Sequence, residues 1–319
     1  MKKWKNKGDK PTRHGFGEGV LEAAKSNDSV VGLGVDITGS VSMNYFAEAF
    51  PERFYSLGVA EQNAVGVAAG MALSGKTPVF STYGVFSALR DADQVRISVC
   101  YNEVHVVIGG AHAGISVGPD GATHQALEDL AIMRALPNMT VLSPCDATQA
   151  KEATKYAINK LNGPVYIRFG REAVPNFITK RYPFEFGKAQ VLTEGKDIAI
   201  FSTGHMTWEA LKAAEELDKE GISARVVNIH TIKPIDEEAI INAASETKAA
   251  LTVEEHQVNA GFGSAVAEVL SENNPTLLRR IGMPDCFGES GQPRELMEKY
   301  GLVAGNIAHQ ARKLLEKVS

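Results

Sequence analysis

The stretches VVGLGV (30–35), PVFST (78–82) and EVHVVIGG (103–110) are short apolar runs rich in β-branched residues. Two more runs of the same kind follow, TVLSP (140–144) and PVYIRF (164–169). The segments between them include the helical periods Glu61–Leu73, Phe86–Val99 and Ala147–Leu161. Apolar strands separated by segments of helical length are typical of a parallel sheet with helices on both faces. The sequence therefore predicts a doubly wound α/β domain.

A second α/β unit follows an irregular segment. The residues RFGREAVPNFITKRYPFEFGKA (168–189) interrupt the pattern with prolines, aromatics and mixed charges. Strand-like runs then restart as DIAIFS (197–202), ARVVNI (224–229), ALTVEE (250–255) and TLLRRI (276–281), and a last helix is expected near Asn306–Lys317. We expect a polar, solvated tail at 1–11, a first domain at 12–178, a linker at 179–187 and a smaller α/β domain at 188–319.

The composition narrows the classes of function. The chain has 319 residues, of which 44% are hydrophobic and 22% charged, as in an ordinary globular protein. Its net charge of −5 lacks the basic excess of a nucleic-acid-binding protein. The 3 cysteines form no CxxC pair, and no apolar stretch approaches the length of a membrane span. We therefore expect a cytoplasmic protein that binds neither nucleic acid nor membranes.

The run GVAEQNAVGVAAGMA (58–72) places Glu61 at the start of an almost wholly apolar helix. One interpretation is an anion that stabilises the helix N-terminus by about 0.3–1 kcal/mol. The other is a carboxyl group that shares a proton with a ligand nitrogen. The small residues around Gly66 and Gly70 allow a second backbone to come close, so they indicate either an interface or tight packing within the chain.

Two further segments place polar and aromatic groups at predicted strand ends. The first is STYGVF, with Tyr83 and Phe86, and the second is the glycine-rich loop 109–125, with His112, Asp120 and His124. Ligands of α/β sheets bind at this edge, and long loops there often form sites. The alternatives are that the aromatics belong to the core, that the loop is a structural turn, or that His112, Asp120 and His124 bind a metal ion.

The segments GVAEQ, STYGVF and GPDGATHQ occur in an order and spacing that resemble the C-terminal portion of transketolases, which are thiamine-diphosphate enzymes. The resemblance extends from about Gly15 to Val318. It implies that Glu61 contacts N1′ of the cofactor's aminopyrimidine and drives that ring to its imino tautomer. It also implies that Tyr83 and Phe86 enclose the ring and that Asp36 lies close to the cofactor.

The same resemblance assigns the substrate groups. Ser40, His112 and Arg171 match residues that bind sugar phosphates, and Asp120 and His124 match positions near the substrate hydroxyls and the reacting centre. The expected catalytic residues are Glu61, His124 and His112. The implied reaction transfers a two-carbon ketol unit from a ketose phosphate to an aldose phosphate, in the carbohydrate metabolism of pentose phosphates.

Transketolases hold the diphosphate through a divalent metal ion on a GDG…N segment, and this sequence contains no GDG. The resemblance therefore implies the C-terminal subunit of a split transketolase, active only with an N-terminal partner subunit that binds the diphosphate and Mg²⁺ or Ca²⁺. We expect self-association as well, giving a heterotetramer. The alternatives are a deoxyxylulose-phosphate synthase-like enzyme, the beta subunit of a 2-oxo acid dehydrogenase's decarboxylating component, and a noncatalytic assembly subunit.

Overall fold

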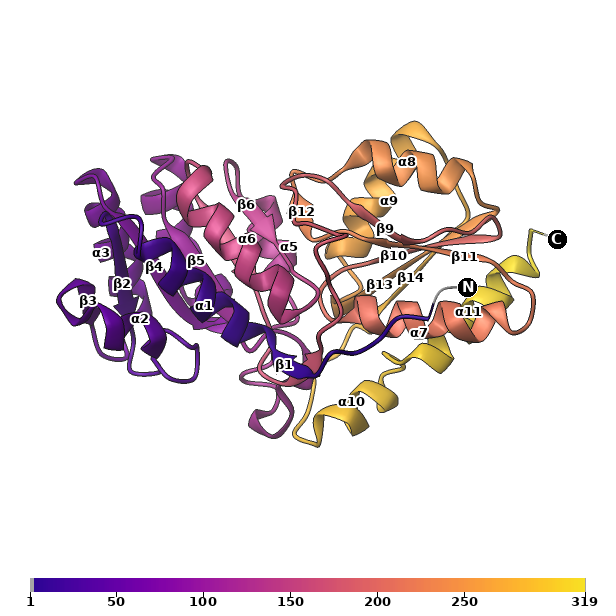
Figure 1. Ribbon diagram of the computed structural model, residues 1–319, viewed down its shortest axis with the longest axis horizontal. Coiled ribbons are helices and arrows are strands. Elements are labelled where there is room, and N and C mark those ends of the chain that lie inside the picture. The colour runs from indigo at the N-terminus through magenta and orange to yellow at the C-terminus, as the bar shows by residue number, and fades with distance from the viewer. Residues whose placement is uncertain (1–2, 319) are drawn as a thin grey trace.

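The computed structural model describes residues 3–318 and shows two α/β domains side by side (Figure 1). The first domain is built on a seven-stranded sheet in the order β12-β6-β7-β5-β4-β2-β3, parallel except for the antiparallel edge strand β12. Its strands are β2 (Val30–Gly34), β3 (Phe54–Ser56), β4 (Thr77–Tyr83), β5 (Val107–Ala111), β6 (Thr140–Leu142), β7 (Val165–Arg168) and β12 (Thr231–Lys233). The predicted doubly wound α/β class is confirmed.

Helices cover this sheet on both faces. They are α1 (Thr12–Ala24), α2 (Asn44–Ala49), α3 (Glu61–Leu73), α5 (Asp129–Ala135) and α6 (Ala147–Lys160). The helices α1 and α6 pack closely because Gly15 has no side chain, and a Cβ there would lie 2.1 Å from the carbonyl oxygen of Ala147. The close approach fixes α1 against the sheet, near the site described below.

The segment expected to be one regular helix at Phe86–Val99 is irregular. It consists of two π-helical turns, η2 (Phe86–Arg90) and η3 (Val95–Tyr101), on either side of the short α4 (Ala92–Gln94). The N–H of Asp91 donates to the carbonyl oxygen of Phe86, five residues back, at 3.1 Å. Such wider turns are rare and often occur at functional sites.

The second domain has a smaller, five-stranded sheet in the order β14-β13-β10-β11-β9, with β9 antiparallel at one edge. Its strands are β9 (Gln190–Thr193), β10 (Ile198–Ser202), β11 (Ala224–Asn228), β13 (Ala249–Gln257) and β14 (Leu278–Met283). The helices α7 (Met206–Asp218) and α11 (Ala304–Leu315) cover one face, and α8 (Glu237–Ser245) and α9 (Phe262–Asn273) cover the other (Figure 1). Within residues 3–318 we find no helix long and apolar enough to cross a membrane.

The expected solvated tail at 1–11 is exposed over most of its described length, but Trp4 anchors it on the protein. The Trp4 side chain is buried, and its ring packs edge-on against Phe177 at a centroid distance of 5.8 Å. Farther along, β1 (Asp9–Pro11) pairs antiparallel with β8 (Ala173–Pro175). The indole ring is buried while the neighbouring Lys3 and Lys5 stay exposed, so one aromatic residue anchors an otherwise polar segment. Met1, Lys2 and Ser319 lie outside the described residues.

A buried arginine of the first domain, Arg168, forms an ion pair within that domain and a hydrogen bond to the second. Arg168, the last residue of β7, donates from Nε to Asp129 Oδ2 on α5 at 2.9 Å, and the hydroxyl of Tyr166 donates to the same oxygen at 2.9 Å. Arg168 also donates from Nη2 to the carbonyl oxygens of Ala126 at 3.2 Å and of Glu255 at 2.8 Å. Because Glu255 belongs to β13, one guanidinium bonds both domains.

We predict that Arg168→Ala lowers the free energy of unfolding by about 3–5 kcal/mol, because it leaves Asp129 as a buried charge without its cation. Urea unfolding measures the change. The matched control is Lys188→Ala, since the Lys188–Glu238 pair is exposed and its loss should cost less than about 1 kcal/mol. Equal losses in the two variants would contradict the importance of the Arg168 contacts.

Candidate functional site

Four rings expected in the site lie together at the carboxyl ends of β4 and β5. The Tyr83 ring lies 4.2 Å from the imidazole of His112 and 5.7 Å from that of His124, measured between ring centroids. The Phe86 ring lies 5.9 Å from Tyr83 and 5.5 Å from His124. We call Tyr83, Phe86, His112 and His124 the ring cluster. The strand ends, the π-helical turn η2 and the glycine-rich loop bring these residues together.

His112 has an uncommon backbone conformation and a buried side chain within the ring cluster. Its backbone has a positive φ of 54°, which is uncommon for a residue other than glycine and stores strain. The side chain is 3% exposed, and its Nδ1 has no hydrogen-bond partner among residues 3–318. Burial lowers the pKa of His112 to about 3, and the nearby cations of Arg13 and Arg171 act in the same direction. The imidazole is therefore neutral near pH 7.

Polar groups border the ring cluster on the His112 side. Arg171 donates from Nη1 to Asp120 Oδ1 at 2.8 Å and to the carbonyl oxygen of Val117 at 3.2 Å. Arg13, in α1, donates from Nη1 to the carbonyl oxygen of Ser40 at 2.9 Å, and its Nε is buried without a partner in the described chain. The contact of Ser40 is thus made by its backbone.

Arg13 is a residue that we did not expect in the site. Like the charge of Arg171, its charge lowers the pKa of His112, so the Arg13 guanidinium is near this imidazole. The sequence signal was weak, because an arginine in the first turn of an amphipathic helix is usually a solvated surface residue. Only the packing of α1 against the loop that contains Ser40 directs the Arg13 side chain toward His112.

Glu61 lies at the first turn of α3, as the sequence predicts, and is 4% exposed. Its Oε2 is 2.8 Å from Nη1 of Arg90, a residue that sequence reasoning missed. The guanidinium carbon of Arg90 lies 4.0 Å from the centroid of the Phe86 ring. A planar, nitrogen-bearing cation is therefore stacked on Phe86 and bonded to Glu61 at once. Phe86 and Arg90 are four residues apart, a spacing that brings two side chains to the same face of a helix. This spacing is the sequence signal that could have identified Arg90.

Asp36 makes its side-chain contact with a residue outside the ring cluster. It follows β2 with a positive φ of 64°, its side chain is exposed, and its Oδ1 accepts a hydrogen bond from Ser56 Oγ at 3.2 Å. Across the described chain, neither a hydrogen bond nor an ion pair joins Asp36 to a residue of the cluster. A role of Asp36 near a cofactor stays a prediction.

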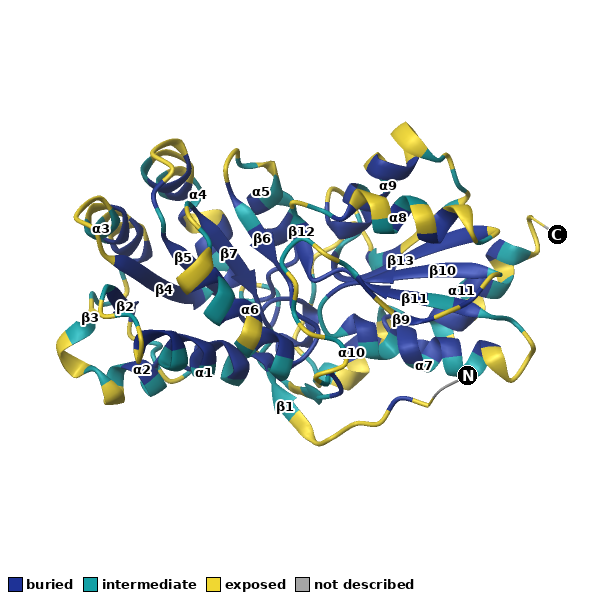
Figure 2. Ribbon diagram, turned by 45° about the horizontal axis from the view of Figure 1, so that its top comes forward, coloured by how far each residue is buried: buried dark blue, intermediate teal, exposed yellow. Residues whose placement is uncertain are grey.

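The outward face of α3 is open and apolar. A Cβ at Gly66 or at Gly70 would meet nothing within 4 Å, so packing within the described chain does not explain these glycines. Val59 is 72% exposed beside them, and Tyr101, on the adjoining η3, is 81% exposed. Figure 2 shows the exposed residues along α3 at one end of the molecule. We call the surface formed by Val59, Gly66, Gly70 and Tyr101 the α3 face. Exposed apolar groups gathered in this way are typical of a protein–protein interface.

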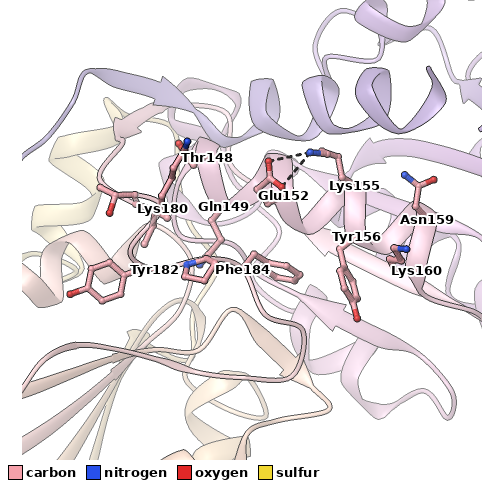
Figure 3. Close-up of a pocket in the computed structure, with 13 residues that line it drawn as sticks. Thr148, Gln149, Glu152, Lys155, Tyr156, Asn159, Lys160, Lys180, Tyr182 and Phe184 are labelled. Atoms are coloured by element: carbon pink, nitrogen blue, oxygen red, sulfur yellow. Dashed lines mark hydrogen bonds and ion pairs between the residues drawn. The ribbon is translucent and has the colours of Figure 1, made fainter. Parts of the chain in front are cut away.

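A cavity elsewhere in the molecule does not involve the expected site residues. It has a volume of about 660 Å³ and lies between α6 and the chain around Tyr182 (Figure 3). Lys155, one of the residues that line it, is paired with Glu152, and none of the expected site residues lines this cavity. Within residues 3–318 there is also no group of three or more His, Cys, Asp or Glu side chains placed to hold a metal ion.

The folds of both domains, with the glutamate, rings and cations at the strand ends, define a protein of the thiamine-diphosphate-dependent transketolase class. Residues 9–176 match the family model of the transketolase pyrimidine-binding domain, and residues 187–307 match that of the transketolase C-terminal domain. The chain belongs to the transketolase family.

More particularly, the chain is similar to subunits of split transketolases. It is 43% identical to a 6-deoxy-6-sulfo-D-fructose transketolase subunit of Clostridium sp. (strain MSTE9), over 93% of this chain and 92% of that protein. A solved split-gene transketolase, described as an inactive beta4 tetramer, is 46% identical with a TM-score of 0.90 and covers 97% of this chain and 99% of its own. A 1-deoxy-D-xylulose-5-phosphate synthase of Caldanaerobacter subterraneus is more distant, at 38% identity over 92% of this chain and 47% of that enzyme.

We predict that His112 makes stability sensitive to acid. A histidine whose pKa falls from 6.5 to about 3 on folding loses stability as the pH falls through this interval, because the unfolded chain binds the proton more readily. The difference in unfolding free energy between wild type and His112→Gln should therefore change by about 1.4 kcal/mol per pH unit between pH 6 and 4. Urea unfolding of the wild type, His112→Gln and the exposed-site control His309→Gln measures it, and a constant difference would refute the buried neutral state.

Proposed function

We propose that the chain is the C-terminal subunit of a thiamine-diphosphate-dependent transketolase that transfers a two-carbon ketol unit from a ketose phosphate to an aldose phosphate. The observation that carries the proposal is the position of the ring cluster. Its Phe86 ring contacts the Arg90 guanidinium that is paired with Glu61, and its His112 imidazole is near the cations of Arg13 and Arg171. A ring-shaped cofactor would thus bind at Phe86 and Glu61, and an anionic substrate would bind next to it at Arg13 and Arg171.

The residues around Phe86 fit an aminopyrimidine ring. The Arg90 guanidinium shows that a planar group bearing nitrogen can stack on Phe86 while it bonds Glu61. An aminopyrimidine makes the same two kinds of contact, with Tyr83 adding a second aromatic wall. The bound cofactor would supply the carbon nucleophile and the electron sink. We assign to Glu61 the proton shared with N1′, and to Tyr83, Phe86 and Asp36 the placement of the cofactor.

The groups around His112 fit a sugar phosphate. Arg13 and Arg171 provide cations for the phosphate, and the neutral imidazole of His112 can accept or donate a hydrogen bond without opposing their charge. We assign to Ser40 a further contact to this phosphate. Asp120 and His124 lie next to these groups and to the rings, so we assign them to the substrate hydroxyls and to proton transfer at the reacting carbon.

The proposal includes a partner subunit. Gly66 and Gly70 of the α3 face lie on the same helix as Glu61. The exposed apolar side chains of this face suit an interface with an N-terminal transketolase subunit. That partner would hold the diphosphate and a Mg²⁺ or Ca²⁺ ion. The relatives named as subunits support this assembly, and self-association into a heterotetramer in the cytoplasm, within pentose phosphate metabolism, completes the proposal.

We predict that the purified chain alone, given thiamine diphosphate and Mg²⁺, shows no ketol transfer, and that addition of the partner restores transfer. In the reconstituted enzyme Glu61→Gln should lower kcat by at least ~10²-fold, the usual scale for loss of acid–base help. Steady-state assays measure turnover, and calorimetry measures cofactor binding separately. Full activity without a second polypeptide would overturn the split assembly, and a kcat near wild type in Glu61→Gln would remove Glu61 from catalysis.

We predict that Arg171→Ala in the reconstituted enzyme raises KM for phosphorylated substrates by ~10–150-fold, the scale of a lost charged hydrogen bond of about 1.5–3 kcal/mol. Unphosphorylated acceptors such as glycolaldehyde should lose little. Arg181→Ala is the matched control, because Arg181 is exposed and lies against Tyr182 instead of the site. The two classes of acceptor are compared by kcat/KM, and equal losses in both would contradict a phosphate contact.

A further inference from the structure

A second carboxyl group, Asp91, is buried close to Glu61. The Asp91 side chain is 0% exposed, and neither Oδ1 nor Oδ2 has a hydrogen-bond partner among residues 3–318. A buried polar group without a partner is costly, and such groups in folded proteins call for a functional explanation. The proposed roles of the ring cluster and of Glu61 do not use this carboxyl group.

The local backbone places Asp91 in the same turn as the residues that contact Glu61. Its N–H closes the π-helical turn onto the carbonyl oxygen of Phe86 at 3.1 Å, and it directly follows Arg90. One turn of chain therefore positions the ring of Phe86, the guanidinium of Arg90 and the buried carboxyl of Asp91. The first residue of α3, Glu61, faces this turn through its ion pair with Arg90.

The charges that act on Asp91 come from two groups in the described chain, Glu61 on α3 and Arg90 on its own turn. Burial raises the pKa of Asp91 to about 7, the charge of Glu61 acts in the same direction, and Arg90 opposes them. Below pH 7 Asp91 therefore carries a proton, while the carboxylate of Glu61 is paired with the guanidinium of Arg90. The two carboxyl groups then hold one proton between them.

We propose that Asp91 is a positioning residue that stores the proton which Glu61 needs when a ring nitrogen replaces the Arg90 guanidinium. This inference rests on the proposed function of Glu61. With Arg90 on Glu61, the proton stays on Asp91. A ring nitrogen that accepts a hydrogen bond from Glu61 requires the protonated form of that carboxyl group, so the proton is then held by Glu61.

The exchange balances between the two carboxyl groups and water. Neither oxygen of Asp91 is hydrogen-bonded to Glu61, so the proton passes through water. The O–H bond of Asp91 breaks and gives its proton to water, water gives a proton to form the O–H bond of Glu61, and the negative charge passes from Glu61 to Asp91. The charge of Arg90 already lowers the pKa of Asp91, so the guanidinium released from Glu61 stabilises the newly ionised carboxylate. No net proton is taken from solvent. Above pH 7, where Asp91 has already lost its proton, the same binding step takes one proton from the buffer.

The experiment compares proton uptake by the complex of the chain with its partner when thiamine diphosphate binds. Calorimetry in buffers of different ionisation enthalpy gives the number of protons taken up per site. Ionisation of the diphosphate contributes equally to each variant, so the difference between Asp91→Asn and wild type isolates this carboxyl group. We expect Asp91→Asn to take up about one proton more than wild type at pH 6 and the same number at pH 8, following the pKa of about 7.

The exposed neighbour Asp93 supplies the matched control, and Asp93→Asn should behave as wild type at both pH values. Equal uptake by Asp91→Asn and wild type at pH 6 would overturn the proposal. A second measurement needs neither cofactor nor partner. In a carboxyl-carbon NMR titration of the chain alone, Asp91 should titrate near pH 7, and Glu61→Gln should lower the pKa of Asp91 by removing the like charge.

The two measurements separate this inference from the proposed function. If Asp91 and Glu61 are coupled in the NMR titration but the complex with the partner binds no thiamine diphosphate, the proposed function is wrong. If the complex binds the cofactor and Asp91 titrates independently of Glu61, the proton store is wrong.

Discussion

The contacts of the Arg168 guanidinium are the constraint on which the arrangement of both domains depends. One planar cation at the end of β7 bonds the carboxylate of Asp129, the carbonyl of Ala126 and the carbonyl of Glu255 in the other domain. A charge this deeply buried is tolerated only when its hydrogen-bonding capacity is used. The loop from His112 to Gln125 ends next to Ala126, whose carbonyl oxygen accepts one of these hydrogen bonds. The conformation of the loop therefore depends on the contact between the two domains.

The glycine-rich loop shows how this constraint reaches the site. Gly114 has a positive φ of 91°, and a Cβ there would lie 2.2 Å from the carboxyl carbon of Glu255. The N–H of Ser116 donates to Glu255 Oε1 at 2.5 Å, while Glu255 Oε2 lies 3.2 Å from Nε2 of His205. The second domain thus supports the loop that carries His112 and Asp120. Its contribution to the site is the position of that loop.

The sequence was most informative where a local pattern is sufficient. Buried parallel strands are continuous apolar runs, so every parallel strand of the two sheets except the short β3 was predicted, and the apolar run after Glu61 set both ends of α3. The antiparallel edge strands β9 and β12 were not predicted. Phe86–Val99 also has a helical pattern, but the hydrogen bond from the N–H of Asp91 to the carbonyl of Phe86 produces a π-helical turn that periodicity does not reveal. Arg13 and Arg90 were missed because the direction of a long side chain depends on its neighbours in space, and Trp4 because a single aromatic gives no periodicity.

The strand β12 crosses the division between the two family segments. Residues 231–233 lie in the stretch that matches the C-terminal domain, yet they pair with β6 and complete the edge of the first sheet. An uncovered edge strand exposes unpaired backbone groups and promotes aggregation. The family segment at 187–307 therefore includes one strand, β12, that belongs to the sheet of the first domain. A chimaera that exchanges C-terminal segments between relatives must exchange β6 and β12 as a matched pair.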